Sequence, residues 1–202
     1  RGRDAGIRTD RIVAFNISPA GPRYAERDRV LAFYRELQSR LAGVGGVESV
    51  GMTSHLPMRA FGWNSYFDVE GGNPWRPGDA PLVEHRWYHG DYLRTMGVRL
   101  LQGRALDERD GESSRAVLFN EAMAKKFWAG QDPIGRRFGQ GTDTSTWYEV
   151  AGVISDVRSF GLAAATPYEF YRTIAQESFA TMTVVIRTTG EDPTLVVPTP
   201  RQ

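Results

Sequence analysis

The stretch RIVAFNIS (residues 11–18) sets the first element of the fold, because its apolar side chains alternate with small or polar ones. Val13, Phe15 and Ile17 share one face of an extended chain, and this period of two is typical of a half-buried β-strand. Pro19 ends the strand, since proline cannot donate a hydrogen bond to a neighbouring strand.

An amphipathic helix is predicted next, from about residue 25 to residue 42. Apolar side chains recur at helical spacing along one face: Val30, Phe33, Tyr34, Leu37 and Leu41. Gly43 follows as a stop signal. The segment VESVGMT (residues 47–53) then reads as a second strand. Together the three elements predict a compact β-α-β unit.

From Arg59 onward the pattern changes to shorter strands separated by turns. Asp91 and Asn120 stand where each could cap a helix, and Gly97 follows the first of these as a stop signal. Strand-like runs are predicted at residues 64–70, 82–88, 98–101, 116–119, 147–157 and 181–188. The predicted helices and strands together therefore indicate an α+β fold.

Composition restricts the function classes. The chain has 202 residues, with 25 Lys and Arg against 24 Asp and Glu, so a nucleic-acid binder that relies on a general basic field is disfavoured. There is no cysteine, which excludes disulfides, thiolate metal sites and a cysteine nucleophile. No run approaches the roughly 18 apolar residues that span a bilayer. Because the chain opens on Arg1, we expect a fragment that has lost membrane segments on either side.

Two groups of side chains suggest metal sites, and neither has the required spacing. His85 and His89 are four residues apart, but they lie in a predicted strand, where that spacing separates them by roughly 13 Å. Acidic residues cluster at Asp107, Glu108, Asp110 and Glu112, without the ligand spacing of a calcium loop. We expect a solvated turn there, and no metal or cofactor.

Catalytic motifs are not evident either. The run GQGT (residues 139–142) lacks the lysine and the strand-to-helix context of a phosphate loop, so it is predicted to be a hairpin tip. No serine stands in a Gly-x-Ser-x-Gly pattern. Arg1, Arg3, Arg8 and Arg11 could touch nucleic acid or lipid head groups, but intervening acids favour a solvated juxtamembrane segment. The chain is predicted not to be an enzyme.

The order of several short motifs resembles a known family. The motifs are FDVEG (67–71), GDYLRTMGV (90–98), LQGR (101–104), VLFNEAMA (117–124), FW (127–128), DPIG (132–135) and YEVAGV (148–153). This series is similar to the periplasmic core domain of MacB-like ABC-transporter permeases, the MacB/FtsX-type group. The resemblance covers nearly the whole chain, from about Arg11 to Thr188.

The resemblance implies a split β-α-β subdomain with an inserted mixed α/β subdomain. Residues 1–58 and 179–202 would form the first, membrane-proximal part, truncated at its C-terminus, and residues 59–178 the second. Gly90, Gly97, Gly103, Gly135 and Asn120 would shape turns and caps rather than a ligand site. Relative movement is expected near residues 57–59 and 179–180.

The same resemblance implies a function. The domain would be the extracytoplasmic, periplasmic part of an inner-membrane permease, and would pass conformational change to periplasmic partners or cargo without catalysis. Its implied partners are an ABC ATPase subunit reached through the full-length permease, a second permease copy and a periplasmic adaptor.

Two alternatives stay open. A solute-binding or sensor module would require a pocket between the subdomains, with Trp63, Tyr66 and Trp75 as conceivable lining residues. Core burial is the default for Trp63, Trp75 and Trp87. A hydrolase would require an active-site serine or a metal.

Overall fold

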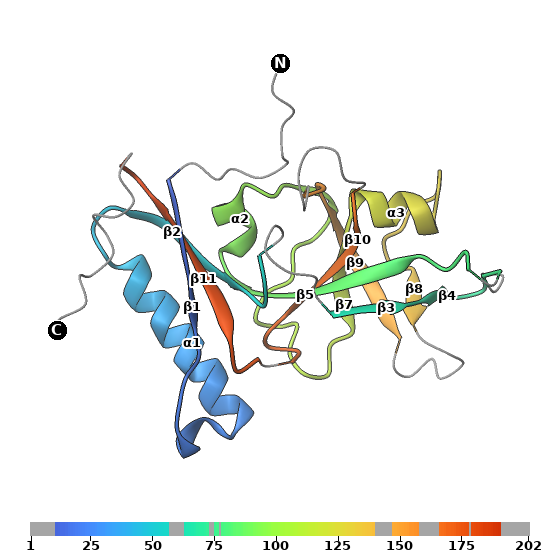
Figure 1. Ribbon diagram of the computed structural model, residues 1–202. Coiled ribbons are helices and arrows are strands. Elements are labelled where there is room, and N and C mark those ends of the chain that lie inside the picture. Colours follow the sequence, from blue (N-terminus) through green and yellow to red (C-terminus); the bar gives the residue numbers. More distant parts are fainter. Residues whose placement is uncertain are drawn as a thin grey trace.

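The computed structural model describes residues 11–56, 63–72, 75–76, 78–139, 147–157, 166–177 and 179–190. In these residues eleven strands form one mixed sheet, with three α-helices packed against it (Figure 1). The strands are β1 (Ile12–Ile17), β2 (Val47–Thr53), β3 (Trp63–Tyr66), β4 (Asp68–Val69), β5 (Leu82–Gly90), β6 (Leu100–Gly103), β7 (Ala116–Asn120), β8 (Arg137–Gly139), β9 (Tyr148–Ile154), β10 (Tyr168–Thr173) and β11 (Met182–Thr188). The helices are α1 (Arg27–Ala42), α2 (Tyr92–Met96) and α3 (Glu121–Phe127). The predicted α+β class is confirmed.

At one end of the sheet, β11 lies between β1 and β2 and runs antiparallel to both. The β-α-β unit is therefore split by a strand that comes last in the described chain, as the resemblance implied. Helix α1 covers one face here, with Val30, Leu31 and Tyr34 buried against Val184 and Ile186 of β11. The predicted apolar stripe of α1 is thus the face that meets the sheet.

Helix α2 covers the opposite face of the same strands. Val185 lies between two residues that face α1, and it packs with Tyr92 and Met96 of α2. The approach is so close that a Cβ on Gly51 of β2 would overlap the backbone of Tyr92. Arg187 is buried on this face and donates from Nη2 to the Thr95 carbonyl at 2.6 Å. Small size at Gly51 is therefore required for two-sided coverage.

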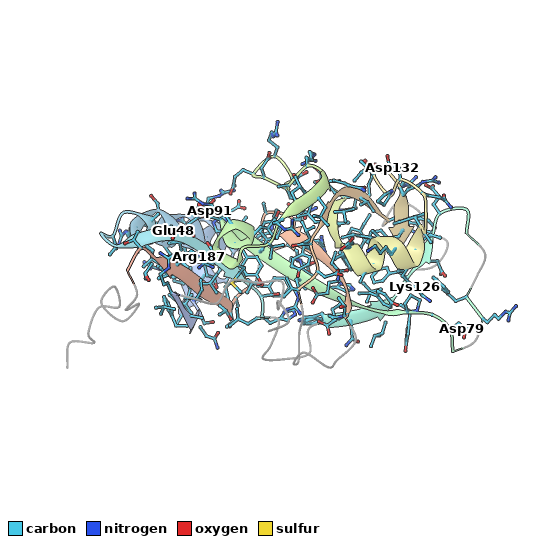
Figure 2. All side chains as sticks on the ribbon, turned by 90° about the horizontal axis from the view of Figure 1, so that it is seen from above. Glu48, Asp79, Asp91, Lys126, Asp132 and Arg187 are labelled. Carbon is cyan, nitrogen blue, oxygen red and sulfur yellow. The ribbon has the colours of Figure 1, made fainter. Side chains whose placement is uncertain are left out.

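Strand β5 connects the two ends of the sheet. Its last residues pair antiparallel with β2, its first residues pair antiparallel with β3, and its other edge pairs parallel with β10. The remaining order is β10-β7-β9-β8-β4, with β6 beside β9. Figure 2 shows Glu48 near one end of the elongated molecule and Asp79 at the other. One nine-residue strand thus belongs to both halves.

The end distant from α1 has its own aromatic core. Phe119, Phe138 and Phe170 are fully buried here, with ring centroids of Phe119 and Phe138 at 4.7 Å. Helix α3 packs on this core through Met123. As predicted, Asn120 caps α3, because its Oδ1 accepts from the Met123 amide at 3.1 Å.

Two local predictions were wrong, and a third was confirmed with a different geometry. The strand predicted at residues 64–70 is broken at Phe67, whose ring is buried against Phe138 and Phe170, so that β3 pairs with β5 while β4 pairs with β8. Helix α1 does end at Gly43, but Gly43 is right-handed, and the left-handed turn occurs at Gly46 with φ 87°. Asp91 precedes α2, but its side chain makes no capping hydrogen bond. Among the described residues, no helix is long and apolar enough to cross a membrane.

Candidate functional site

The region where the two ends of the sheet meet is centred on Trp87 of β5. Ser54, just after β2, donates its amide to the Trp87 carbonyl at 2.9 Å, and its hydroxyl accepts from the Trp87 amide at 3.2 Å. Phe179, just before β11, lies with its ring centroid 4.4 Å from that of Trp87. Both chain connections between the ends therefore contact one residue. Of the expected hinge segments, residues 57–59 lie outside the described residues.

A buried ion cluster lies beside this contact. Arg86 is fully buried, and its Nη2 and Nε donate to Oε1 of Glu169 at 2.6 and 2.8 Å. Its Nη1 donates to the His55 carbonyl at 3.2 Å, and the Tyr171 hydroxyl donates to Oε2 of Glu169 at 2.7 Å. Arg86 thus fixes the segment after β2 to the centre of the sheet.

Burial governs the protonation of this cluster. Burial disfavours a charge on Arg86, but the neighbouring Glu169 more than compensates, so the pKa of Arg86 is raised. Burial raises the pKa of Glu84, although Arg86 opposes the shift from 3.1 Å. Burial also raises the pKa of Tyr171 well above its ordinary value. The cluster therefore holds charges that are satisfied internally and exposes none to a ligand.

Helix α1 meets the acidic loop at residues 107–112 through charged side chains. Arg27 Nη1 lies 2.7 Å from Oε2 of Glu112, and Nη2 of Arg27 donates to the Ala175 carbonyl. About two turns further along α1, Arg35 forms an ion pair with Glu108. These contacts join residues that are far apart in the sequence, on the outer rim of the junction.

The acidic loop is more ordered than the solvated turn that its composition predicts. Asp110 is buried, and Arg104 donates to both of its carboxylate oxygens at 2.7 and 2.8 Å. Arg104 accordingly lowers the pKa of Asp110. The exposed Asp107 binds Arg109, which lowers the pKa of Asp107 to about 2. The expectation of a solvated turn was therefore wrong for Asp110, whereas Glu108 and Glu112 remain largely exposed although each forms an ion pair.

A cavity of about 330 Å³ lies under the ion pairs between α1 and the acidic loop. It is lined by Gln38 of α1, by His89 and Gly90 of β5, and by Glu108. His89 is buried, its Nδ1 lies 3.9 Å from Oε1 of Glu108, and its Nε2 has no hydrogen-bond partner within the described part of the chain. Burial lowers the pKa of His89, so the ring is neutral at pH 7. The rim of the junction thus encloses space that side chains do not fill.

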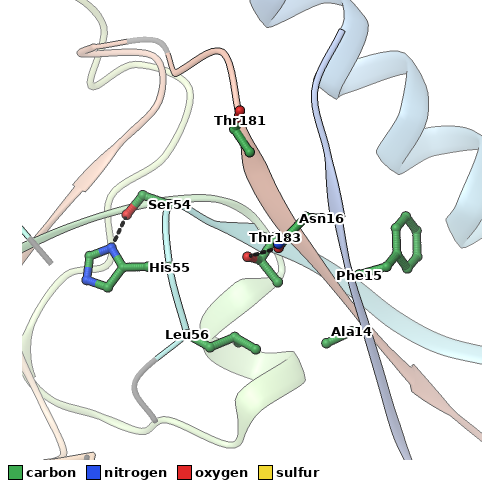
Figure 3. Close-up of a pocket in the computed structure, with 8 residues that line it drawn as sticks. All are labelled: Ala14, Phe15, Asn16, Ser54, His55, Leu56, Thr181 and Thr183. Atoms are coloured by element: carbon green, nitrogen blue, oxygen red, sulfur yellow. Dashed lines mark hydrogen bonds between the residues drawn. The ribbon is translucent and has the colours of Figure 1, made fainter. Parts of the chain in front are cut away.

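A second cavity, also of about 330 Å³, lies on the sheet face beyond α2 (Figure 3). Asn16 and Thr183 line it and share a hydrogen bond of 2.7 Å, and Leu56 closes one side. The Ser54 hydroxyl lies 2.9 Å from Nδ1 of His55 in this cavity. Burial, with help from Arg86, lowers the pKa of His55 to about 3, so the ring is a poor general base for Ser54.

The residues suggested for a solute pocket do not converge. Trp63 is 68% exposed, and its side chain lies on the opposite face of β3 from that of Tyr66, because side chains alternate along a strand. Trp75 instead donates to the Phe67 carbonyl at 2.8 Å and packs beside Lys126. The prediction of core burial is confirmed for Trp87, which is buried, and is wrong for Trp63. A solute site built on these three residues is therefore not supported.

The other candidate residues have structural roles. His85 and His89 lie on β5, as the predicted strand required. Within the described ranges, no group of three His, Cys, Asp or Glu side chains could hold a metal ion. Arg11 lies 3.4 Å from Glu48 and donates to the Thr189 carbonyl at 3.0 Å, whereas Arg1, Arg3 and Arg8 lie outside the described residues, as does most of the run at 139–142.

Sequence reasoning missed the residues that build the junction: Arg27, Arg35, Arg86 and Glu169. Arg86 and Glu169 stand beside aromatic residues in β5 and β10, and a charge in such surroundings is a usable signal for a buried pair. Arg27 and Arg35 are ordinary polar-face residues of an amphipathic helix, and nothing in the sequence indicates that Glu108 and Glu112 face them.

Comparisons with known proteins agree on one family. The model of the MacB-like periplasmic core domain matches residues 6–197. The periplasmic region of MacB from Actinobacillus actinomycetemcomitans has a similar structure, with TM-score 0.58 and 15% identity over 95% of this chain and 80% of that one. A domain assigned to a permease of Porphyromonas gingivalis has TM-score 0.52 and 17% identity over 93% and 79% of the two chains.

A third similar structure is the extracellular domain of the noncanonic ABC-type transporter YknZ from Gram-positive bacteria. It has TM-score 0.50 and 17% identity over 77% of this chain and 72% of that one. A search of curated proteins finds no significant match. At these identities the structural likeness establishes the fold, and the family model establishes the kinship.

Proposed function

We propose a mechanical role for this chain, which belongs to the MacB-like periplasmic core domain family. Membership confirms the resemblance read from the motifs between residues 67 and 153, and with it an extracytoplasmic, periplasmic location. We place the domain in the permease of an ABC transporter, where it transmits conformational change from the membrane to periplasmic partners or cargo. The similar structures from MacB and YknZ support that placement.

The observation that carries the mechanical role is the construction of the junction. Ser54 and Phe179, on the two connections between the ends of the sheet, both contact Trp87 in the middle of β5. A shared strand with an apolar contact beside it can act as a pivot, because β5 can twist without breaking its ladder. Transmission through a pivot needs no reactive group.

The proposed division keeps the predicted boundaries. Residues 1–58 and 179–202 would form the membrane-proximal part, on which α2 and the end of β5 also pack, and the rest of residues 59–178 would form the inserted part that carries motion outward. The proposed partners are the ATPase subunit, reached through the full-length permease, a second permease copy and a periplasmic adaptor.

Distance measurements on the full-length permease with its ATPase test the proposal. The described domain contains no cysteine, so spin labels can be placed at Ser39→Cys on α1 and Ala129→Cys after α3, two exposed positions at opposite ends. We expect the distance between the labels to differ between the nucleotide-free and ATP-trapped states.

The control pair is Ser39→Cys with Glu48→Cys, both near α1, whose distance should stay constant. An unchanged distance between positions 39 and 129 across the ATPase cycle would refute the mechanical role. A change in the control pair of equal size would mean that α1 and β2 move internally, which also contradicts a rigid membrane-proximal part.

A further inference from the structure

The contact between α1 and the acidic loop consists of two ion pairs on one side of an unfilled cavity. Arg27 binds Glu112 and the Ala175 carbonyl, and Arg35 binds Glu108. Below them, the cavity of about 330 Å³ separates Gln38 of α1 from the loop. Beneath the rim Gln38 packs closely on Gly90 of β5, so α1 and the acidic loop themselves touch through charged side chains.

The loop side of this contact is rigid. Asp110 is held by Arg104, and its carbonyl accepts from the Thr173 hydroxyl at 3.1 Å. Gln176 donates to the carbonyls of Ser114 and Ala116 at 3.2 and 2.7 Å. The acidic loop, the start of β7 and the turn after β10 thus form one body. A force on Glu108 or Glu112 passes directly to the central strands.

The face of α1 that meets the sheet is held differently. Ile174 is buried in the same apolar cluster as Val30 and Tyr34, and Trp87 belongs to this cluster as well. Apolar contacts have no preferred direction, so they tolerate a small rotation better than ion pairs with fixed partners do. The junction therefore has an apolar side that can serve as an axis and a charged side that resists opening.

We infer that Arg27 and Arg35, with Glu112 and Glu108, form a charge latch that sets the resting angle between α1 and the acidic loop. Opening the latch widens the cavity and tilts α1 on the apolar cluster that contains Ile174 and Trp87. The inference rests on the proposed mechanical function and names the contact that motion from the membrane must break first.

Exposure determines how strong the latch is. The side chains of Arg35 and Glu108 are 52% and 60% exposed, so water and salt weaken their attraction. Removing one such pair should shift the ratio of closed to open molecules by about two- to fivefold. Removing both should shift it by about tenfold. A latch of this strength holds a resting angle and still yields to a partner.

The latch can be tested on the 202-residue chain without its ATPase. Spin labels at Ser39→Cys on α1 and Ser113→Cys in the loop, both exposed, report the width of the contact. We expect Arg35→Glu to increase the population at longer distances by about two- to fivefold. The exchanged pair, Arg35→Glu with Glu108→Arg, should restore the original distribution.

The matched control is Arg40→Glu, which makes the same charge change on the same helix. Arg40 pairs within α1 with Glu36 at 2.5 Å, away from the loop, so its distribution should match that of the unaltered chain. If Arg35→Glu leaves the distances unchanged in a folded chain, or the exchanged pair fails to restore them, the latch is refuted.

Salt gives a second measurement that needs no substitution at the latch. Raising salt from about 0.1 M to about 1 M shortens the screening length from about 10 Å to about 3 Å. The longer distances between the labels should then gain population, and an unchanged distribution would overturn the latch.

Failure of the proposed mechanical function can be distinguished from failure of the latch. A working latch with no ATP-dependent change in the full permease refutes only the transmission. An ATP-dependent change of equal size with Arg35→Glu refutes only the latch.

Discussion

Arg86–Glu169 and Arg35–Glu108 use the same two side-chain types in opposite surroundings. The first pair is fully buried between β5 and β10, whereas the second is more than half exposed at the rim of α1. A buried charge cannot lose its partner without remaining desolvated, but an exposed charge is taken over by water. The difference teaches that the centre of this sheet resists separation, while its rim can open at low cost.

The same difference assigns separate tasks to the two regions. The centre joins β5, β10 and the His55 carbonyl into one unit, and the rim only limits how far α1 can turn. Four changes test this division, and they are ordered here by the size of the effect expected.

Arg86→Met should have the largest effect. It leaves Glu169 buried without its cation, which costs about 3–5 kcal/mol of unfolding free energy. Urea denaturation measures the loss. Adding Glu169→Leu to the same chain should recover much of it, because Glu169 then no longer remains as a buried charge, although Glu84 still lacks its partner. If Arg86→Met lowers the unfolding free energy no more than Arg35→Ala does, the contrast between the buried and the exposed ion pair is wrong.

Gly51→Ala tests how closely the centre is packed. The new Cβ would overlap the Tyr92 backbone of α2, and overpacking of this kind costs about 1–3 kcal/mol. Gly45→Ala is the matched control, because nothing lies within 4 Å of its Cβ position. Thermal unfolding should show a loss of stability for Gly51→Ala only. Equal losses of stability in both variants would mean that α2 is not tightly packed against β2.

Acid should weaken the centre through His55. Its pKa falls from the ordinary 6.5 to about 3 in the folded chain, so the unfolded chain binds a proton first as the pH drops. The stability from neutral His55 is complete above pH 6.5 and is lost as the pH falls toward 3. We expect a loss of about 1 kcal/mol by about pH 5, after allowing for partial exposure of the ring.

His55→Gln isolates that contribution. The variant should lose less stability between pH 7 and pH 5 than the unaltered chain, as measured by urea denaturation at each pH. Identical pH profiles would show that the ring is solvated in the folded chain, contrary to its buried position beside Arg86.

Arg35→Ala should have the smallest effect, about 0.2–1 kcal/mol at low salt. At about 1 M salt the effect should vanish, since the screening length is then only about 3 Å. The loss of unfolding free energy in Arg86→Met should persist at the same salt concentration, because buried ion pairs are screened much less. If the loss of stability in Arg35→Ala persists at high salt, the ion pair at the rim behaves like the buried pair at the centre, which contradicts the comparison.

Much of the fold could be predicted from local patterns. The stripe on α1 describes a single element whose buried face is visible in one stretch of chain, and the alternation in residues 12–17 identifies a strand, although Phe15 on its predicted buried face is exposed. Asn120 at the start of α3 and the left-handed Gly97 after α2 are equally local signals. The break at Phe67 was not predictable, because it depends on the rings of Phe138 and Phe170, which come from distant strands.

The candidate site was predicted far less well. Residues 57–59 and 179–180 were expected near a junction, but the four charged side chains of the latch were not identified. The tryptophans considered for a pocket gave no guide, since Trp87 is buried and Trp63 is exposed although both lie in strand-like sequence. Composition indicates how polar a segment is, and it does not indicate which segment lies opposite.

By itself the sequence determined the family, the α+β class and the amphipathic faces of the main elements. These properties depend on the periodicity of side chains along a few neighbouring residues, and on motifs that keep their order. Only the tertiary structure decided that β11 separates β1 from β2, that Arg86 meets Glu169 in the centre, and that Arg27 and Arg35 face the acidic loop. The physical reason is that pairing between distant segments depends on which surfaces the whole chain can bury together.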